Sequence, residues 1–205
     1  MRLLASALVL ASFHFSIRPL PAPVRTQVAS AWHAGCPVPL SGLRLLTVDY
    51  WGFDGSVHSG EIVVDAEAAP KLARVFNRLY ELRFPIHHMA LDNAYGADQP
   101  ADGDVSSAFS CRQAVPSPCV GGTGTGHWSE HAYGEAVDLN PVENPYVGCG
   151  MTRDKLALSY LDRSRLRRGM VTPAVVQAFA DVGWGWGGSW AGSTKDYMHF
   201  SATGH

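Results

Sequence analysis

The sequence predicts an α+β fold, a single domain in which a small antiparallel sheet is flanked by helices. A length of 205 residues with 46% apolar and 17% charged side chains is typical of one globular domain. Strand-like and helix-like segments are grouped along the chain rather than alternating regularly. No internal repeat or linker interrupts them. These observations together favour one α+β domain.

The first elements read as a hairpin. Residues 43–53 and 60–64 are rich in β-branched and aromatic side chains, and Asp54-Gly55-Ser56 between them is a turn sequence. A helix follows from Ala66 to about Leu82, because its apolar residues recur at helical spacing. We expect Asp65 to cap it.

The middle of the chain carries shorter elements. Pro85 ends the helix, and a strand is predicted over residues 86–91. In that strand one of the consecutive histidines His87 and His88 would be buried and the other exposed, which does not favour a shared metal. Residues 92–107 read as a loop, and Ala108–Arg112 as the next strand.

Four more segments complete the predicted fold. The glycine-rich residues 121–126 form a turn, which is not a phosphate loop because no Gly-Lys-Ser/Thr follows. Residues 136–139 alternate as a strand does. A helix runs from Thr172-Pro173 to Ala180, and the last two strands lie over 183–186 and 197–201.

The N-terminus has the pattern of a secretory signal over residues 1–31. A basic start precedes an apolar run too short to span a membrane, and Ala29-Ser30-Ala31 is a suitable cleavage site. The alternative is an uncleaved anchor. We therefore expect a domain of residues 32–205, monomeric, without stable membrane insertion, and either secreted or held in the periplasm or cell wall.

Charge argues against a nucleic-acid partner. The chain has a formal charge of −2, and residues 1–31 contain three arginines and no acidic residue, so the remainder carries −5. Phosphate backbones are bound by clustered Lys and Arg. An acidic domain lacks that footprint.

Four cysteines in an exported chain predict two disulfides, with three possible connectivities. Cys111 and Cys119 enclose a short loop with two prolines. A local bridge between them is the simplest pairing, and it leaves Cys36 to bond with Cys149.

Two motifs carry the candidate chemistry. The first is Ser129-Glu-His131-Ala-Tyr-Gly-Glu-Ala-Val-Asp138, and the second is Asp196-Tyr-Met-His199. A catalytic zinc site uses three protein ligands and keeps a fourth position open. Two histidines and one carboxylate, His131, Asp138 and His199, would be those ligands for one Zn²⁺ ion.

The first motif resembles the S-x-H-x-x-G-x-A-x-D signature of the M15 peptidases, the D-alanyl-D-alanine carboxypeptidase family. The resemblance runs from about residue 36 to 200 and includes residues 107–112, 138–146 and 183–188. It implies a Hedgehog/DD-peptidase-like fold, a single zinc ion and peptidoglycan stem peptides as substrate. It favours a D-alanyl-D-alanine carboxypeptidase slightly over an endopeptidase.

The resemblance also implies catalytic roles. Asp196 would be the general base, which takes a proton from the attacking water and returns it to the leaving amine. Arg112 falls where the family places an arginine and would stabilise the oxyanion. The alternative is that Arg112 pairs with Asp102 or Asp104.

Other side chains are candidates for contact with substrate. Ser129 would orient His131 beside the metal. The aromatic residues could line the cleft or pack in the core. Those considered for the cleft are Tyr197, Trp186, Trp184 and Trp190. His205 is expected at the surface.

Two other functional classes stay open. Relatives of this fold include binding domains that keep zinc without using it, but loss of Asp196 or Arg112 would be expected in one of those. A serine hydrolase built on Ser129, His131 and Asp138 is disfavoured, because no G-x-S-x-G motif is present.

Overall fold

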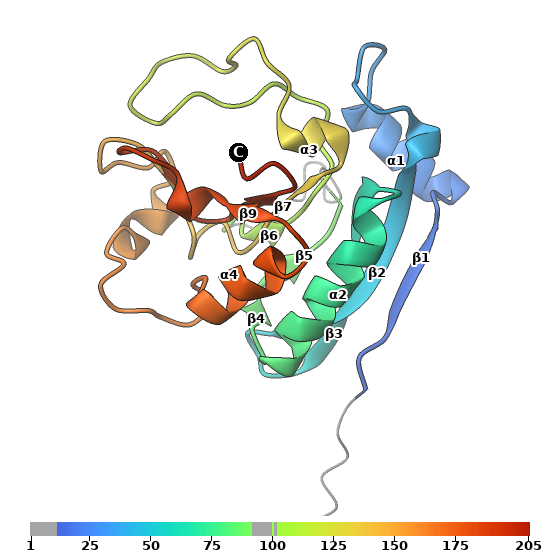
Figure 1. Cartoon of the computed structure of the whole chain (residues 1–205), viewed down its shortest axis with the longest axis horizontal. Helices are drawn as coiled ribbons and strands as arrows, with labels where there is room; N and C mark the ends of the chain where they lie inside the picture. Colours follow the sequence, from blue (N-terminus) through green and yellow to red (C-terminus); the bar gives the residue numbers. More distant parts are fainter. Residues whose placement is uncertain (1–11, 92–99, 101) are drawn as a thin grey trace, which may run out of the picture.

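A sheet built on a long hairpin forms one side of the molecule (Figure 1). The structure is a computed structural model that describes residues 12–91, 100 and 102–205. Strands β2 (Leu43–Gly52) and β3 (Val57–Asp65) pair antiparallel, which confirms the predicted hairpin. The predicted α+β class is confirmed, since helices pack on mainly antiparallel sheets.

The predicted signal segment contains two elements. Strand β1 (Phe15–Pro19) pairs antiparallel with β2 but is exposed along its whole length. Helix α1 (Ala22–Ala31) buries only Val28. Residues 1–11, including most of the apolar run, lie outside the described residues, so the cleavage stays a prediction. Within the described ranges, no helix has both the length and the apolar character to cross a membrane.

Helix α2 (Ala68–Glu81) covers the sheet, and its prediction is confirmed. Its buried face includes Leu72, Phe76 and Leu79. The predicted cap is wrong. The helix begins later than expected, with Glu67 at its N-cap, and Asp65 Oδ1 instead accepts a hydrogen bond from Glu67 N at 2.8 Å. Such a bond two residues along the chain forms a turn before the helix.

The predicted strand over residues 86–91 is divided at His87. Its parts are β4 (Pro85–Ile86), parallel to β2, and β5 (His88–Met89), parallel to β6 (Val105–Ser106). The predicted loop over residues 92–107 therefore contains β6, and residues 92–99 and 101 of it lie outside the described residues.

The predicted strand over residues 108–112 is irregular in the structure. Its backbone bonds are divided between strand β3 and the segment around His131: Phe109 N donates to Val63 O, Ser110 N donates to His131 O, and Ser129 N donates to Arg112 O.

A second, three-stranded sheet carries the C-terminal half. Its order is β7 (Ala136–Asp138), β11 (His199–Ser201) and β9 (Gly185–Trp186), all antiparallel. Helix α4 (Pro173–Ala180) packs beside it and confirms the predicted helix, with Thr172 at its N-cap. Phe179 stacks on Phe200 with ring centroids 3.8 Å apart. One hydrophobic core joins this sheet to α2 and the hairpin sheet.

Short elements complete the fold. Strands β8 (Tyr146–Val147) and β10 (Lys195–Asp196) pair antiparallel, and α3 spans Glu130–Tyr133. The 3₁₀ helices η1, η3 and η4 cover Leu40–Gly42, Leu156–Tyr160 and Gly187–Ser189.

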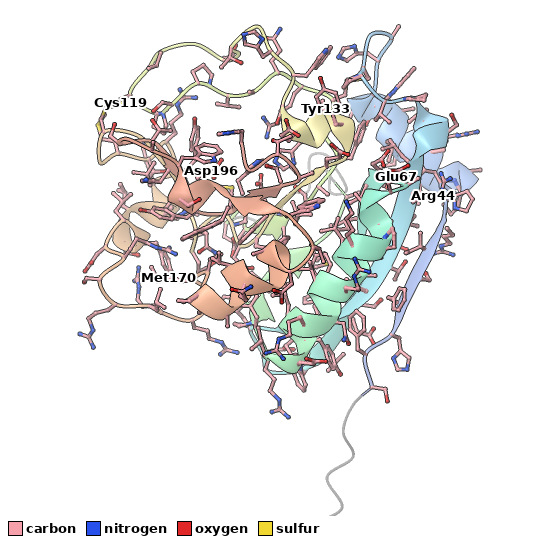
Figure 2. All side chains as sticks on the ribbon, viewed as in Figure 1. Arg44, Glu67, Cys119, Tyr133, Met170 and Asp196 are labelled. Carbon is pink, nitrogen blue, oxygen red and sulfur yellow. A yellow bond between two sulfur atoms is a disulfide. The ribbon has the colours of Figure 1, made fainter. Side chains whose placement is uncertain are left out.

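Both disulfides differ from the predicted pairing. The bonds are Cys36–Cys111 and Cys119–Cys149. Cys36 and Cys111 belong to one hydrophobic cluster beside α1, whereas Cys119 lies on the side of the molecule away from α1 (Figure 2). Arg153 Nη2 also donates to Val120 O at 2.9 Å, which holds the loop near Cys149. The local pairing is wrong because contacts distant in sequence place the two ends of this loop.

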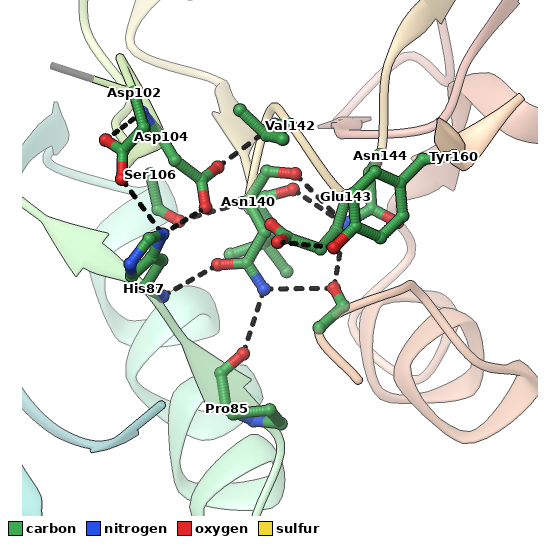
Figure 3. A network of polar contacts seen from close by, with 12 residues as sticks. Pro85, His87, Asp102, Asp104, Ser106, Asn140, Val142, Glu143, Asn144 and Tyr160 are labelled. Carbon is green, nitrogen blue, oxygen red and sulfur yellow. Dashed lines mark hydrogen bonds and ion pairs between the residues drawn. The ribbon is translucent and has the colours of Figure 1, made fainter. Parts of the chain in front are cut away.

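A buried polar network follows β7 (Figure 3). Asn140 has a left-handed φ of 45°, and its Nδ2 donates to Pro85 O and Gly169 O at 2.8 and 3.0 Å. Asn144 Nδ2 also donates to Gly169 O, at 2.9 Å. These bonds fix the chain immediately after Asp138.

Glu143 in this network predicts a pH-dependent stability. Burial, and then the neighbouring Asp104 carboxyl, raise the pKa of Glu143 from 4.5 to about 8. The folded chain therefore keeps a proton that the unfolded chain releases near pH 4.5. This contribution to stability is complete below pH 4.5 and is lost as pH rises towards 8. We expect Glu143→Gln to lessen the fall in Tm between pH 5 and 8, measured by calorimetry.

The matched control is Glu81→Gln, which changes an exposed carboxylate on α2. Its Tm should follow the wild-type pH dependence. Parallel curves for Glu143→Gln and wild type would contradict the raised pKa of Glu143.

Candidate metal centre

The three predicted ligands meet at one point. His131 Nε2 lies 3.2 Å from Asp138 Oδ2, and His199 Nδ1 lies 3.2 Å from Asp138 Oδ1. The two imidazole nitrogens are also 3.2 Å apart. Zinc bonds of about 2.0–2.2 Å place tetrahedral ligand atoms at roughly this separation. Both histidines are buried and Asp138 nearly so.

Local structure explains how His131 reaches the site. Ser129 caps α3, and its Oγ accepts a hydrogen bond from His131 N at 3.3 Å. Gly134 ends α3 with a φ of 72°, and a Cβ there would lie 2.6 Å from Asp65 N. This position therefore requires glycine, which lets the chain turn directly into β7.

Strand pairing places the other two ligands. Asp138 on β7 and His199 on β11 are direct partners in the antiparallel register. Their side chains therefore lie on the same face of the sheet, next to α3. Strand β11 thus brings His199 to the site, although His199 lies 61 positions after Asp138 in the sequence.

Backbone carbonyls fix the two imidazoles. His131 Nδ1 donates to Ala108 O at 2.6 Å, and His199 Nε2 donates to His205 O at 3.1 Å. A carbonyl only accepts, so the opposite ring nitrogens, His131 Nε2 and His199 Nδ1, keep their lone pairs for a metal. Ser201 Oγ donates to the same His205 carbonyl at 2.8 Å.

His205 is exposed, as expected of a surface group, but that expectation did not include this role. It lines the cavity at the site, and its carbonyl orients His199. A backbone acceptor has no sequence signal, so only the fold could reveal it.

Charges in the cluster compensate one another. Burial raises the pKa of Asp138, but the two histidines lower it more, so its pKa is held well below the usual range. Burial lowers the pKa of His199, and the Asp138 carboxylate reverses this and leaves it raised.

Asp196 faces the same cavity, which has a volume of about 340 Å³. Asp196 Oδ1 is buried and has no hydrogen-bond partner among the described residues. Burial, and then the charge of Asp138, raise the pKa of Asp196 to about 7, against the opposing effects of His199 and Arg112. A carboxylate with a free acceptor atom and a pKa near neutrality can both take and return a proton.

Asp196 lies in a short strand of its own. It is in β10, opposite Tyr146 of β8, while His199 is in β11. Gly187 contacts it closely, since a Cβ on Gly187 would lie 2.5 Å from Asp196 O. Because Asp196 and His199 lie in different strands, both can face the cavity although they are only three positions apart in the sequence.

Arg112 lines the cavity from the opposite segment. Its carbonyl accepts from Ser129 N, and the neighbouring Cys111 is anchored by the disulfide to Cys36. The alternative partner Asp104 pairs with His87 instead, at 2.7 Å. Arg112 therefore stands beside the candidate ligands.

Only some of the residues considered for contact with substrate line the cavity. Ser129 and Trp190 line the cavity, whereas Trp184 is buried in the core. Trp186 Nε1 donates to Tyr197 O at 2.9 Å, and neither of these two residues lines the cavity. Contact of Tyr197 and Trp186 with substrate stays a prediction.

Sequence reasoning did not select several lining residues. Tyr146 lies at the end of the segment 138–146, and its strand pairing with Asp196 brings it to the cavity. The lining residues that were not singled out for this role are Ala114, Val115, Trp128, Glu130, Tyr146 and Met198.

Comparison with known proteins adds one finding. Residues 123–202 match a peptidase M15 family model described as D-alanyl-D-alanine carboxypeptidase. The matched segment contains His131, Asp138, Asp196 and His199. No curated protein and no solved structure matches the chain. The match confirms the resemblance predicted from the motifs.

Proposed function

We propose that this chain, an M15 family peptidase by its residues 123–202, is a zinc-dependent hydrolase of the stem peptides of bacterial peptidoglycan. The observation that carries the proposal is the convergence of His131, Asp138 and His199 beside an unpartnered Asp196 oxygen. Part of the proposal is that the domain has a Hedgehog/DD-peptidase-like fold and acts outside the cytoplasm, where this substrate lies.

The residues present fit a zinc ion. Two imidazoles, each oriented by a backbone carbonyl, and one ionised carboxylate are the donors of a catalytic zinc site, and three ligands leave a position open. Zinc held there would polarise the scissile carbonyl and lower the pKa of water towards about 7.

The protein groups supply proton transfer and charge. Asp196 holds its free oxygen in the cavity, where it accepts the proton of the attacking water. The same carboxyl then returns the proton to the leaving amine. Arg112 places a permanent positive charge where negative charge develops on the carbonyl oxygen.

Arg112→Ala is expected to lower kcat by about 10²–10³-fold, because loss of one oxyanion donor typically has that effect. Arg112→Lys should restore part of it, since it keeps the charge but not the planar donor geometry. The measurement is steady-state hydrolysis of a synthetic stem peptide.

The control for this pair is exposed Arg78 on α2, where Arg78→Ala should leave kcat unchanged. An Arg112→Ala enzyme with raised KM and wild-type kcat would contradict oxyanion stabilisation. It would instead assign Arg112 to ground-state substrate binding.

The proposal also includes which peptide bond is cleaved. We favour removal of the terminal D-alanine. One observation supports the endopeptidase alternative. Arg112 is the only Lys or Arg among the described residues that line the cavity. A carboxypeptidase would need a donor for the terminal carboxylate in addition to the oxyanion donor.

Product analysis separates these two activities. Purified protein with zinc is incubated with a pentapeptide stem ending in D-Ala-D-Ala, and with the same peptide amidated at its C-terminus. Release of D-alanine from the free acid alone indicates a carboxypeptidase. Cleavage of an internal bond in both peptides indicates an endopeptidase.

A further inference from the structure

A second group of metal-ligating side chains lies outside the catalytic cavity. One ligand atom from each of His87, His88 and Asp102 falls within 4.8 Å of the others. The histidines follow β4, and Asp102 precedes β6. They meet because β5 and β6 pair in parallel, with His88 opposite Val105.

A buried carboxylate supports this group. Asp104 is fully buried, and its Oδ2 lies 2.7 Å from His87 Nδ1, with Asp102 Oδ2 3.7 Å from the same nitrogen (Figure 3). Asp104 Oδ1 accepts from Val142 N at 3.0 Å. The carboxylate is therefore fixed on the backbone and orients the His87 ring, as carboxylates do behind metal-binding histidines.

An ordinary ion pair between His87 and Asp104 does not account for His88. The two imidazole rings are stacked with centroids 4.6 Å apart and an interplanar angle of 21°. The stacking holds the His88 ring beside the His87 ring, so two imidazoles and the Asp102 carboxylate lie together.

A third group of potential metal ligands lacks available thiolates. His33 lies near Cys36 and Cys111, but both sulfurs belong to a disulfide and are not available as thiolate ligands.

We propose that His87, His88 and Asp102 form a second binding site for a divalent transition metal, with Asp104 as the positioning residue. Two imidazoles and one carboxylate suit Zn²⁺. All three side chains are half-buried, so an ion can reach them from solvent.

The site is connected to the strand that carries Asp138. His87 N donates to Asn140 Oδ1 at 3.0 Å, and Asn140 lies two residues beyond Asp138. A metal on His87 would stabilise this connection. Bound zinc should therefore raise the Tm of the protein through this site as well as through the catalytic one. The inference does not depend on the proposed peptidase activity.

The test is zinc stoichiometry, measured on the full chain by competition with a chromophoric chelator. Wild type should bind two ions, and His88→Ala or Asp102→Asn one. His131→Ala should also bind one, and the double variant His131→Ala/His88→Ala none. Asp104→Asn, which keeps an acceptor for Val142 N, should weaken the second site by about 10–100-fold.

Two controls keep the result interpretable. His58→Ala, which removes an exposed histidine paired with Asp54, should still bind two ions. Circular dichroism without zinc establishes that each variant is folded, and the conservative Asp102→Asn serves if His88→Ala is not. A wild-type protein that binds one ion, or two ions that persist with equal affinity in His88→Ala and Asp102→Asn, would overturn the proposal.

Discussion

Asp196→Asn is expected to lower kcat for stem-peptide hydrolysis by about 10³-fold, within the range of general acid–base catalysis. Asparagine has nearly the same shape but cannot accept the proton of the attacking water. Asp196 Oδ1 has no partner among the described residues, so the substitution removes no hydrogen bond of that atom. Steady-state kinetics with saturating zinc provides the measurement.

Zinc content separates catalysis from metal binding in this variant. Asp196 is not one of the three convergent ligands, so Asp196→Asn should bind zinc as wild type does. Wild-type kcat in Asp196→Asn would exclude this residue as the base. Loss of both zinc and activity would instead make Asp196 a ligand.

His131→Ala is expected to abolish hydrolysis to the limit of detection. The variant removes one of three ligands and leaves Asp138 with a single imidazole partner, so the catalytic ion should be lost. Without the ion, water keeps a pKa near 15.7, far above the pKa of about 7 of the Asp196 carboxyl that accepts its proton. Zinc binding and peptide hydrolysis are measured on the same preparation.

The control for His131→Ala is again His58→Ala, which should keep full activity. Folding must also be measured, because His131 bonds to Ala108 O and is buried. A folded His131→Ala protein that hydrolyses the peptide at the wild-type rate would contradict the assigned ligand set.

The regular elements with strong local signals could be predicted from the sequence. The hairpin, α2 and α4 each have a regular pattern of apolar residues, and residues that begin or end the element, within one continuous segment. The structure confirms all three. The strand expected over residues 108–112 failed because its backbone hydrogen bonds are divided between β3 and the segment around His131 and do not follow one partner strand. Hydrogen bonds between segments distant in sequence determine the backbone conformation there.

The disulfides failed for a related reason. Sequence proximity favoured Cys111 with Cys119, but the hydrophobic cluster beside α1 brings Cys36 to Cys111. Loop closure over 75 residues costs little more than over a short loop. Proximity in sequence is therefore weak evidence for a pairing.

The candidate ligands could be predicted because their residue types and spacing are chemically restrictive. Their positioning groups could not, since Ala108 and His205 act through backbone carbonyls. The cavity aromatic Tyr146 likewise depends on the pairing of β8 with β10. Such contacts depend on tertiary structure and leave no pattern in one chain.

The most direct test of the account is hydrolysis of a synthetic peptidoglycan stem peptide by the purified chain, before and after chelation, with zinc added back. We predict cleavage that stops on chelation and returns with zinc. Zinc binding without cleavage of any stem peptide would identify a binding domain instead. Cleavage that persists after complete removal of the metal would contradict the zinc-dependent mechanism.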